Sequence, residues 1–387
     1  LKRCRCGPHL FQTPSRAPRC VAARPEAAMS SLRSRRGQGL ASAGLSIATS
    51  VRSPTTASVQ SANSTSATYV GIRQSPQAKA GFRVMTEEEF AKIYKLTGRV
   101  MESTNTGMEV SFATNLRDKK EVVIKTRERA RSFKKASDER DWRATMEIQL
   151  NMPKTDTMCT LYELIETKQN YYVVMEKVEG RDLFECMARE KLSVKDARDI
   201  TFQILTAVKS LHDAGRIHKD LKLENVMVDR SSPPTSPGTV KIIDFDTVQD
   251  WEPTSPKTRD VLGTDGYIAP EAYDGVYSPA SDIYCVGVIM YRLLTRKFPS
   301  REDLFDDQPG ENWVGSPAMK RIKERLRDEK IDFLRPPLNR IPAAADLCAK
   351  MLVFDPCDRI NVDDALKHSW FGLNEDDLSP KAPKKSF

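Results

Sequence analysis

Residues 217–225 read IHKDLKLEN and combine charged and amide side chains with apolar neighbours. They precede a short apolar run at 226–228, and a loop rich in serine and proline, 231–238, follows that run. A second apolar run then leads into Asp-Phe-Asp at 244–246. Carboxylate and amide groups are therefore expected on loops that adjoin short regular elements.

This set of side chains suits the transfer of a phosphoryl group. Such a transfer requires that charge on several phosphate oxygens be neutralised. Two oxygen ligands for Mg²⁺, one lysine and one positioning carboxylate supply that with little covalent chemistry. Three short patterns carry the signal: Val-Ile-Lys at 123–125, Asp-Phe-Asp at 244–246 and Ala-Pro-Glu at 269–271. Each recurs by chance in unrelated proteins, but their order on strand, helix and loop makes a strong combined signal.

In this order the residues resemble the eukaryotic protein kinases of the serine/threonine type, over about residues 96–371. The resemblance implies an α+β, bilobal fold, with a small β-rich N-lobe that holds one key helix and a larger, mainly helical C-lobe. It implies a serine/threonine protein kinase that moves the γ-phosphoryl group of ATP to protein hydroxyls with Mg²⁺. The calcium-dependent and calcium/calmodulin-dependent branch is the most similar.

The resemblance also gives roles to individual residues. Asp220 should accept the proton of the substrate hydroxyl, and Asn225 and Asp244 should ligate Mg²⁺. Lys125, which ends a VVIK stretch, should contact the α- and β-phosphates, with Glu147 as its ion-pair partner.

Further residues are expected to bind substrate and nucleotide. Lys222, two residues after the expected base, and Thr264 are typical of serine/threonine kinases, and Lys222 is grouped with the catalytic residues. The backbone from Glu176 to Val178 should bind adenine. The expected contacts of adenine and ribose are Val110, Val123, Glu176, Val178, Asp182 and Met227.

Three features depart from the kinase pattern. Ser103, Asn105 and Met108 stand where the nucleotide loop of these kinases has glycines, which let the backbone approach phosphates. Asp246 adds negative charge near the metal, and Val123 narrows the space above adenine. These departures keep a second function open, that of a pseudokinase, which is a nucleotide-binding or scaffolding module without turnover.

Two ion pairs are expected from the alignment. Arg359 should pair with Glu271. Asp260 stands where many kinases carry a phosphothreonine, and we expect it to pair with Lys219 and order the segment without phosphorylation.

Substrate choice and calcium control follow from other residues. Glu224 and Asp182 stand where basophilic kinases hold an arginine upstream of the acceptor, so protein substrates with a Ser or Thr near basic residues are expected. No calcium-binding loop of the EF-hand pattern and no basic amphipathic segment follows the kinase-like region. Calcium or calmodulin control is therefore not supported.

The excess of positive charge belongs to the first part of the chain. The protein has 387 residues and a net charge of +8, but residues 1–86 hold 13 Lys and Arg against one acidic residue. The remainder holds 48 basic and 52 acidic residues, so no basic face for nucleic acid is expected there.

Composition also divides the chain into segments. Residues 1–85 form a basic leader rich in Ser and Arg that is expected to be disordered. The N-lobe is expected at 86–178, the C-lobe at 179–372 and a flexible tail at 373–387. The leader resembles a transit peptide, so organelle targeting stands beside a cytoplasmic location, and the start site, at Met29 or elsewhere, stays open.

Regular elements are predicted from periodicity and from capping residues. Thr86 and Glu89 form a capping-box pattern ahead of a short helix. No apolar stretch is long enough to cross a bilayer, and Cys285 and Cys348 are expected to pack in the core. The predicted strands are 96–102, 108–114, 120–125, 160–166 and 170–176, and the predicted helices are 138–150, 195–213, 279–294, 316–327, 342–352 and 362–368.

Overall fold

The computed structural model describes residues 34–35, 80–101, 107–229 and 238–374. The chain divides into two compact units, 1–32 and 33–387, and every described residue belongs to the second. Most of the expected leader, the proline-rich loop apart from Gly238, and the tail beyond residue 374 lie outside the described residues.

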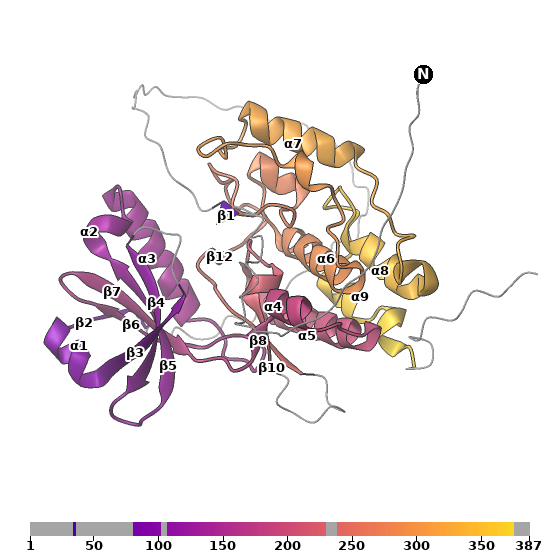
Figure 1. The fold of residues 1–387 in the computed structure, drawn as a ribbon. Helices are drawn as coiled ribbons and strands as arrows, with labels where there is room; N and C mark the ends of the chain where they lie inside the picture. The colour runs from indigo at the N-terminus through magenta and orange to yellow at the C-terminus, as the bar shows by residue number, and fades with distance from the viewer. Residues whose placement is uncertain (1–33, 36–79, 102–106, 230–237, 375–387) are drawn as a thin grey trace, which may run out of the picture. The chain divides into compact units, whose positions relative to one another are not determined.

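A six-stranded sheet forms the N-terminal lobe (Figure 1). Its neighbours pair antiparallel, except β2 and β6, which are parallel. The sequence predicts five of these strands; β2 lies before the expected start of the fold and is too short for a periodic pattern to reveal it. In sheet order the strands are β2 (Phe82–Val84), β6 (Leu161–Glu166), β7 (Asn170–Glu176), β5 (Glu121–Glu128), β4 (Met108–Asn115) and β3 (Tyr94–Met101).

The capping box at the first helix is confirmed. Helix α1 (Glu87–Ile93) begins after Thr86, whose hydroxyl accepts a hydrogen bond from the Glu89 N–H at 3.2 Å. The Glu89 carboxylate accepts one from the Thr86 N–H at 2.8 Å. Phe90 stacks on Tyr172 of the sheet with ring centroids 3.8 Å apart, so the helix covers the edge of the hydrophobic core.

Two helices, α2 (Arg129–Ser132) and α3 (Ala136–Leu150), follow β5. Arg143 of α3 donates hydrogen bonds to Glu166 at 2.5 Å and to the hydroxyl of Tyr171 at 2.8 Å. Met146 is buried on the same side of the helix. These contacts fix which face of α3 packs on the sheet, and they leave Glu147 exposed.

The C-terminal lobe is mainly helical, as expected (Figure 1). Among the described residues, no helix combines the length and the apolar character that a membrane crossing requires. The α-helices of the C-terminal lobe are α4 (Leu183–Arg189), α5 (Val194–Asp213), α6 (Pro279–Thr295), α7 (Pro317–Asp328), α8 (Pro342–Met351) and α9 (Val362–Leu366). Its short 3₁₀ helices are η1 (Leu223–Asn225), η2 (Pro270–Asp274), η3 (Glu302–Leu304), η4 (Leu338–Arg340) and η5 (Ser369–Gly372).

Short paired strands connect the loops of this lobe to one another. Strands β10 (Val226–Asp229) and β11 (Thr239–Ile242) form a hairpin, and β8 (Arg181–Asp182) pairs with β10 on its other side. The remaining pairs are β9 (Arg216–Ile217) with β12 (Gln249–Asp250), and β13 (Gly263–Thr264) with β1 (Ser34–Arg35).

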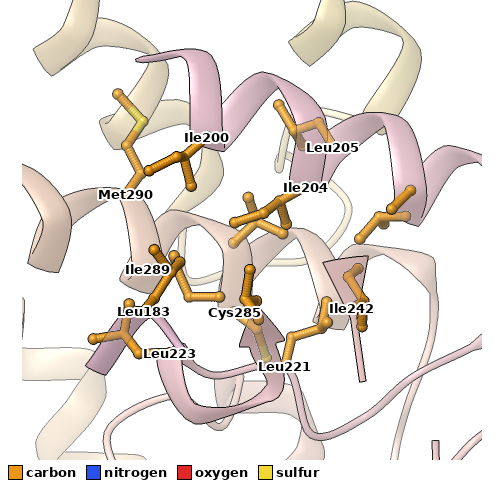
Figure 2. Close-up of a cluster of buried hydrophobic side chains, with 14 of the residues drawn as sticks. Leu183, Ile200, Ile204, Leu205, Leu221, Leu223, Ile242, Cys285, Ile289 and Met290 are labelled. Atoms are coloured by element: carbon orange, nitrogen blue, oxygen red, sulfur yellow. The ribbon is translucent and has the colours of Figure 1, made fainter. Parts of the chain in front are cut away.

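Helices α5 and α6 form the centre of the C-lobe core (Figure 2). The residues at helical spacing that predict the apolar stripe of α5 are buried throughout, at 3% exposure or less: Ile200, Ile204, Leu205, Val208 and Leu211. Ile204 of this stripe lies close to Ile289 and Cys285 of α6, and Leu221 and Leu223 approach from the 217–225 loop (Figure 2). Cys285 and Cys348 are both buried and free, which confirms their expected place in the core.

The predicted ion pair between Arg359 and Glu271 is confirmed. The guanidinium donates to both carboxylate oxygens, at 2.7 and 2.9 Å, and both residues are buried. Arg359 also donates to the backbone carbonyls of Val353, Ala280 and Phe354. The pair therefore ties η2 to the loop before α9, because every N–H donor of the charged group has a fixed acceptor.

Replacing Arg359 by Met should destabilise the fold strongly. The carboxylate of Glu271 would stay buried without its cation, which costs about 3–5 kcal/mol of unfolding free energy. Urea denaturation measures this loss. The matched control is Lys350→Met, which removes the exposed pair with Asp346 and should cost about 1 kcal/mol or less. Equal losses in the two variants would contradict the structural role given to Arg359.

Candidate active site

The 217–225 loop is held in place by one buried carboxylate. Asp282, in the first turn of α6, is fully buried and accepts hydrogen bonds from the N–H groups of His218 and Lys219, both at 2.9 Å. His212, at the end of α5, lies 3.0 Å from the same carboxylate. A single side chain thus joins two helices to the loop that carries Asp220.

The charge of Asp282 is stabilised by its partners. Burial alone would raise the pKa of Asp282. Two neighbours lower it on balance: His212, through its hydrogen bond and its charge, and His218, through its charge and its backbone N–H. Lys219 needs this support, because its φ of 70° is in the left-handed region that side chains adopt at a cost. The carboxylate therefore fixes a backbone conformation that the sequence by itself disfavours.

Asp220 is buried within a small hydrogen-bonded group. The Thr264 hydroxyl donates to Asp220 at 2.8 Å, and Lys222 lies 3.3 Å from the other carboxylate oxygen. Lys222 also donates to the Thr264 hydroxyl at 2.9 Å. The side-chain amide of Asn225 donates to the backbone carbonyl of Asp220 at 2.8 Å. The structure thus brings together four of the residues singled out from the sequence.

Lys125 lies between the two acids of Asp-Phe-Asp. Its ammonium nitrogen is 2.6 Å from Asp244 and 2.9 Å from Asp246. Asp244 adopts a φ of 61°, and Phe245 between the two acids is fully buried against His218. The turn therefore directs both carboxylates toward the same lysine.

The expected ion pair between Lys125 and Glu147 is not formed in the structure. Glu147 is exposed on α3, and no hydrogen bond or ion pair of its carboxylate occurs among the described residues. The physical reason is that the Asp-Phe-Asp turn brings two carboxylates to Lys125, whereas Arg143, one helical turn before Glu147, pairs with Glu166 and Tyr171. This part of the sequence-based expectation is therefore corrected.

The donor set suits a magnesium ion. Asp244 offers a carboxylate, and Asn225 offers an amide oxygen because its NH₂ group donates to Asp220. Mg²⁺ prefers such oxygen ligands and usually keeps several waters beside one or two carboxylates and substrate phosphates. The residues present therefore fit the ion that the resemblance implies.

The residues expected around adenine lie on adjoining strands. Lys125 of β5 pairs with Val110 of β4 and with Val173 of β7, and Val123 precedes it on the same face of β5. Val178 follows β7, and its N–H has no hydrogen-bond partner among the described residues. An unpaired donor at that point suits a ring-nitrogen acceptor of a bound base.

Other expected nucleotide contacts also have structural partners. Glu176 accepts from the N–H of Thr160 at 3.1 Å and forms an ion pair with Lys241. Asp182 caps α4 by accepting from the Glu185 N–H at 2.7 Å, and burial raises the pKa of its carboxyl group. Met227 is half-buried, and its backbone pairs with Asp182 between β10 and β8.

Position 107 requires glycine for its backbone conformation and for its close contact with α2. Gly107 has a φ of 75°, and a Cβ there would lie 2.8 Å from the hydroxyl of Ser132 in α2. Its carbonyl accepts hydrogen bonds from that hydroxyl at 3.1 Å and from the Glu128 N–H at 2.8 Å. Ser103 and Asn105 lie outside the described residues, whereas Met108 begins β4.

The predicted pair between Asp260 and Lys219 is wrong. The Lys219 ammonium donates instead to Gln249 of β12 at 2.9 Å, and its nitrogen lies 5.7 Å from the centre of the Tyr277 ring. Asp260 forms a backbone bridge with Trp313. The side-chain oxygen of Gln249 accepts the hydrogen bond of the Lys219 ammonium, and the segment around Asp260 pairs with the backbone near Trp313 instead.

Residues 106–371 match the family model described as the protein kinase domain. The chain belongs to the protein kinase family. The fold agrees, with its β-sheet N-lobe and helical C-lobe. This protein kinase contains Asp220, Asn225, Asp244 and Lys125, the residues to which the resemblance gives catalytic and metal-binding roles, and Lys125 has Asp246 rather than Glu147 beside it.

Similar curated proteins are serine/threonine kinases. The serine/threonine-protein kinase dkf-1 of Caenorhabditis elegans is 31% identical over 326 residues, 82% of this chain and 42% of that protein. Calcium-dependent protein kinase 4 of Plasmodium berghei is 33% identical over 55% of this chain and 38% of its own length. Calcium/calmodulin-dependent protein kinase type IV of mouse is 32% identical over 62% and 48%. The kinase chain thus spans less than half the length of these relatives.

The sequence did not predict the contacts of three residues at this site. Asp246 contacts Lys125, Thr264 bridges Asp220 and Lys222, and Asp282 holds the loop backbone. Asp282 alone had a usable signal, since a carboxylate at the start of an apolar helix needs a buried partner. The contacts of the other two depend on loop geometry.

The lowered pKa of Lys219 should make the stability of the protein depend on pH. Burial lowers the pKa of this lysine to about 8, whereas lysine in an unfolded chain titrates near about 10.4. Between these values the unfolded chain binds one more proton than the folded protein, so stability rises with pH there.

Urea denaturation at several pH values tests this expectation. The free energy of unfolding of the wild type should rise relative to that of Lys219→Met by about 1–3 kcal/mol from pH 8 to pH 10. Parallel pH profiles of the two proteins would show that Lys219 is not protonated differently in the two states.

Proposed function

We propose that this protein is a serine/threonine protein kinase that transfers the γ-phosphoryl group of ATP to protein hydroxyls with Mg²⁺. The single observation that supports it best is the hydrogen-bonded group around Asp220, with Thr264, Lys222 and Asn225 as its members. Asn225 and Asp244 would hold the metal ion, whose charge would neutralise the phosphates.

In this proposal each protein group has a defined task. Asp220 accepts a hydrogen bond from the substrate hydroxyl and takes its proton. Lys222 and Thr264 fix the orientation of that carboxylate, and Lys222 adds positive charge beside the oxygen that attacks. Lys125, on strand β5, neutralises phosphate charge.

The pseudokinase alternative is favoured by two observations. Asp246 brings an additional carboxylate to Lys125, and Glu147 is directed away from it. Both features alter charge at the phosphate site without removing Asp220 or the oxygen ligands. Since electrostatic stabilisation is usually the largest catalytic contribution, the surviving groups favour turnover.

The deciding experiment is transfer of labelled phosphate from ATP to a protein substrate by the full chain. Asp220→Asn should lower the rate about 100-fold or more, because an amide cannot take the substrate proton. Omission of Mg²⁺ should abolish transfer. Equal signal from the wild type and Asp220→Asn, with nucleotide binding intact, would assign the chain to the pseudokinase class.

We also propose that the substrates carry basic residues upstream of the acceptor. One carboxylate oxygen of Glu224 is buried and has no hydrogen-bond partner among the described residues. A buried oxygen of this kind is costly unless a donor reaches it, and an arginine of a peptide would supply one. Asp182 adds a second carboxylate on β8, although one of its oxygens caps α4.

Peptide kinetics test the role of Glu224. For a serine peptide with an upstream arginine, Glu224→Gln should lower kcat/KM about tenfold, because a charge-assisted hydrogen bond is lost. For the matched peptide with alanine in place of arginine, the change should stay within about twofold. A similar loss for both peptides would show that Glu224 acts on folding or on nucleotide and not on peptide selection.

The remaining expectations on partners and location stay proposals. We propose a cytoplasmic location, with organelle targeting by the leader as the alternative, and neither nucleic-acid nor membrane partners. The calcium dependence in the names of some relatives is not carried over to this chain.

A further inference from the structure

The ammonium of Lys125 is paired within the Asp-Phe-Asp turn. Asp246 lies 2.9 Å from it, and the Asp246 side chain is 8% exposed. Asp244 lies 2.6 Å from the same nitrogen and is 19% exposed. A carboxylate as buried as Asp246 is stable only with a charged or hydrogen-bonding partner, so this contact is part of the local structure.

The turn that carries Asp246 is fixed on both sides. Phe245 is fully buried, and its carbonyl accepts a hydrogen bond from the Val248 N–H at 3.1 Å. The hydroxyl of Thr247 donates to the carbonyl of His218 at 2.7 Å. The position of the Asp246 carboxylate is therefore set by the loop that also carries Asp220.

The residue expected to hold Lys125 is directed elsewhere. Glu147 is exposed, and α3 is anchored through Arg143 to Glu166 and Tyr171. Met146 and Gln149 of α3 are buried on its packed face. Glu147 lies one helical turn after Arg143, yet its carboxylate has no hydrogen bond or ion pair among the described residues.

We propose that Asp246, and not Glu147, is the positioning residue for Lys125. Its carboxylate holds the ammonium beside Asp244, at the place where the proposed function requires a cation for the nucleotide phosphates. The residue that departs from the kinase pattern at the end of Asp-Phe-Asp thus replaces the helix glutamate in that role. The inference rests on the proposed function for what Lys125 binds, but not for what holds Lys125.

Charge and positioning predict opposite effects on nucleotide affinity. Asp246→Asn removes a negative charge near the phosphates, and that change alone strengthens the binding of an anionic nucleotide. If Asp246 positions Lys125, the same variant weakens binding, because the ammonium is no longer held in place. The sign of the change therefore separates the two explanations.

Calorimetric titration of the full chain with ADP in the absence of Mg²⁺ measures that sign. Asp246→Asn should weaken binding at least about fivefold in the wild-type background and less than about twofold in a Lys125→Met background. Glu147→Gln should change affinity less than about twofold. Asp213→Asn, which removes an exposed carboxylate at the end of α5, is the matched control.

A second measurement needs no nucleotide. Acetylation of Lys125 by a water-soluble amine-reactive ester, quantified by mass spectrometry, should be at least about threefold faster in Asp246→Asn, because the amine then keeps only Asp244 of its two carboxylate partners and is held less firmly. Glu147→Gln should leave the rate unchanged. Asp246→Gly serves as a second variant should the amide substitution impair folding, as judged by thermal unfolding.

Each outcome bears on one proposal. Unchanged or tighter ADP binding in Asp246→Asn, an equal loss in the Lys125→Met background, or a larger effect of Glu147→Gln would overturn the inference. If no ADP binding is detected, the acetylation rates decide it. An absence of phosphate transfer together with the expected binding and acetylation results would reject the proposed function and leave the role of Asp246 intact.

Discussion

The buried carboxylate of Asp282 is the interaction on which the candidate active site depends. It accepts hydrogen bonds from two successive N–H groups of the 217–225 loop and lies beside His212 of α5. Asp282 lies on α6, and both α5 and α6 belong to the main core, so the loop is attached to two buried helices (Figure 2). The hydrogen bonds around Asp220 depend on this backbone conformation, because Asp220 directly follows the two residues that Asp282 holds.

Each carboxylate at the site has a lysine beside it, but the site keeps a net negative charge. Lys222 adjoins Asp220, and Lys125 adjoins Asp244 and Asp246. The acids outnumber the lysines in this group, so a divalent cation would reduce an existing excess of negative charge.

Patterns of residues predicted the elements and most of the site, but not the contacts between them. The apolar stripe of α5, the capping box at Thr86 and the pair of Arg359 with Glu271 follow from spacing or motif, and the structure contains each of them. Lys125 pairs with the two acids of the 244–246 turn, and Glu147 has no partner among the described residues; spacing along the chain predicts neither. Similarly, the partner of Lys219 comes from a glutamine on β12, and no periodic pattern marks such a residue.

Strand β5 is paired on both of its edges, which limits what a change of loop length can do. Its pairing with β7 aligns Lys125 with Val173, and this alignment does not involve the turn between β4 and β5. An insertion at 116–120 would shift β4 along β5 and move Val110 away from Lys125, whereas the lysine itself would keep its place. A change in the length of this turn would therefore move the residue of β4 that lies opposite Lys125 and leave the alignment of Lys125 with β7 unchanged.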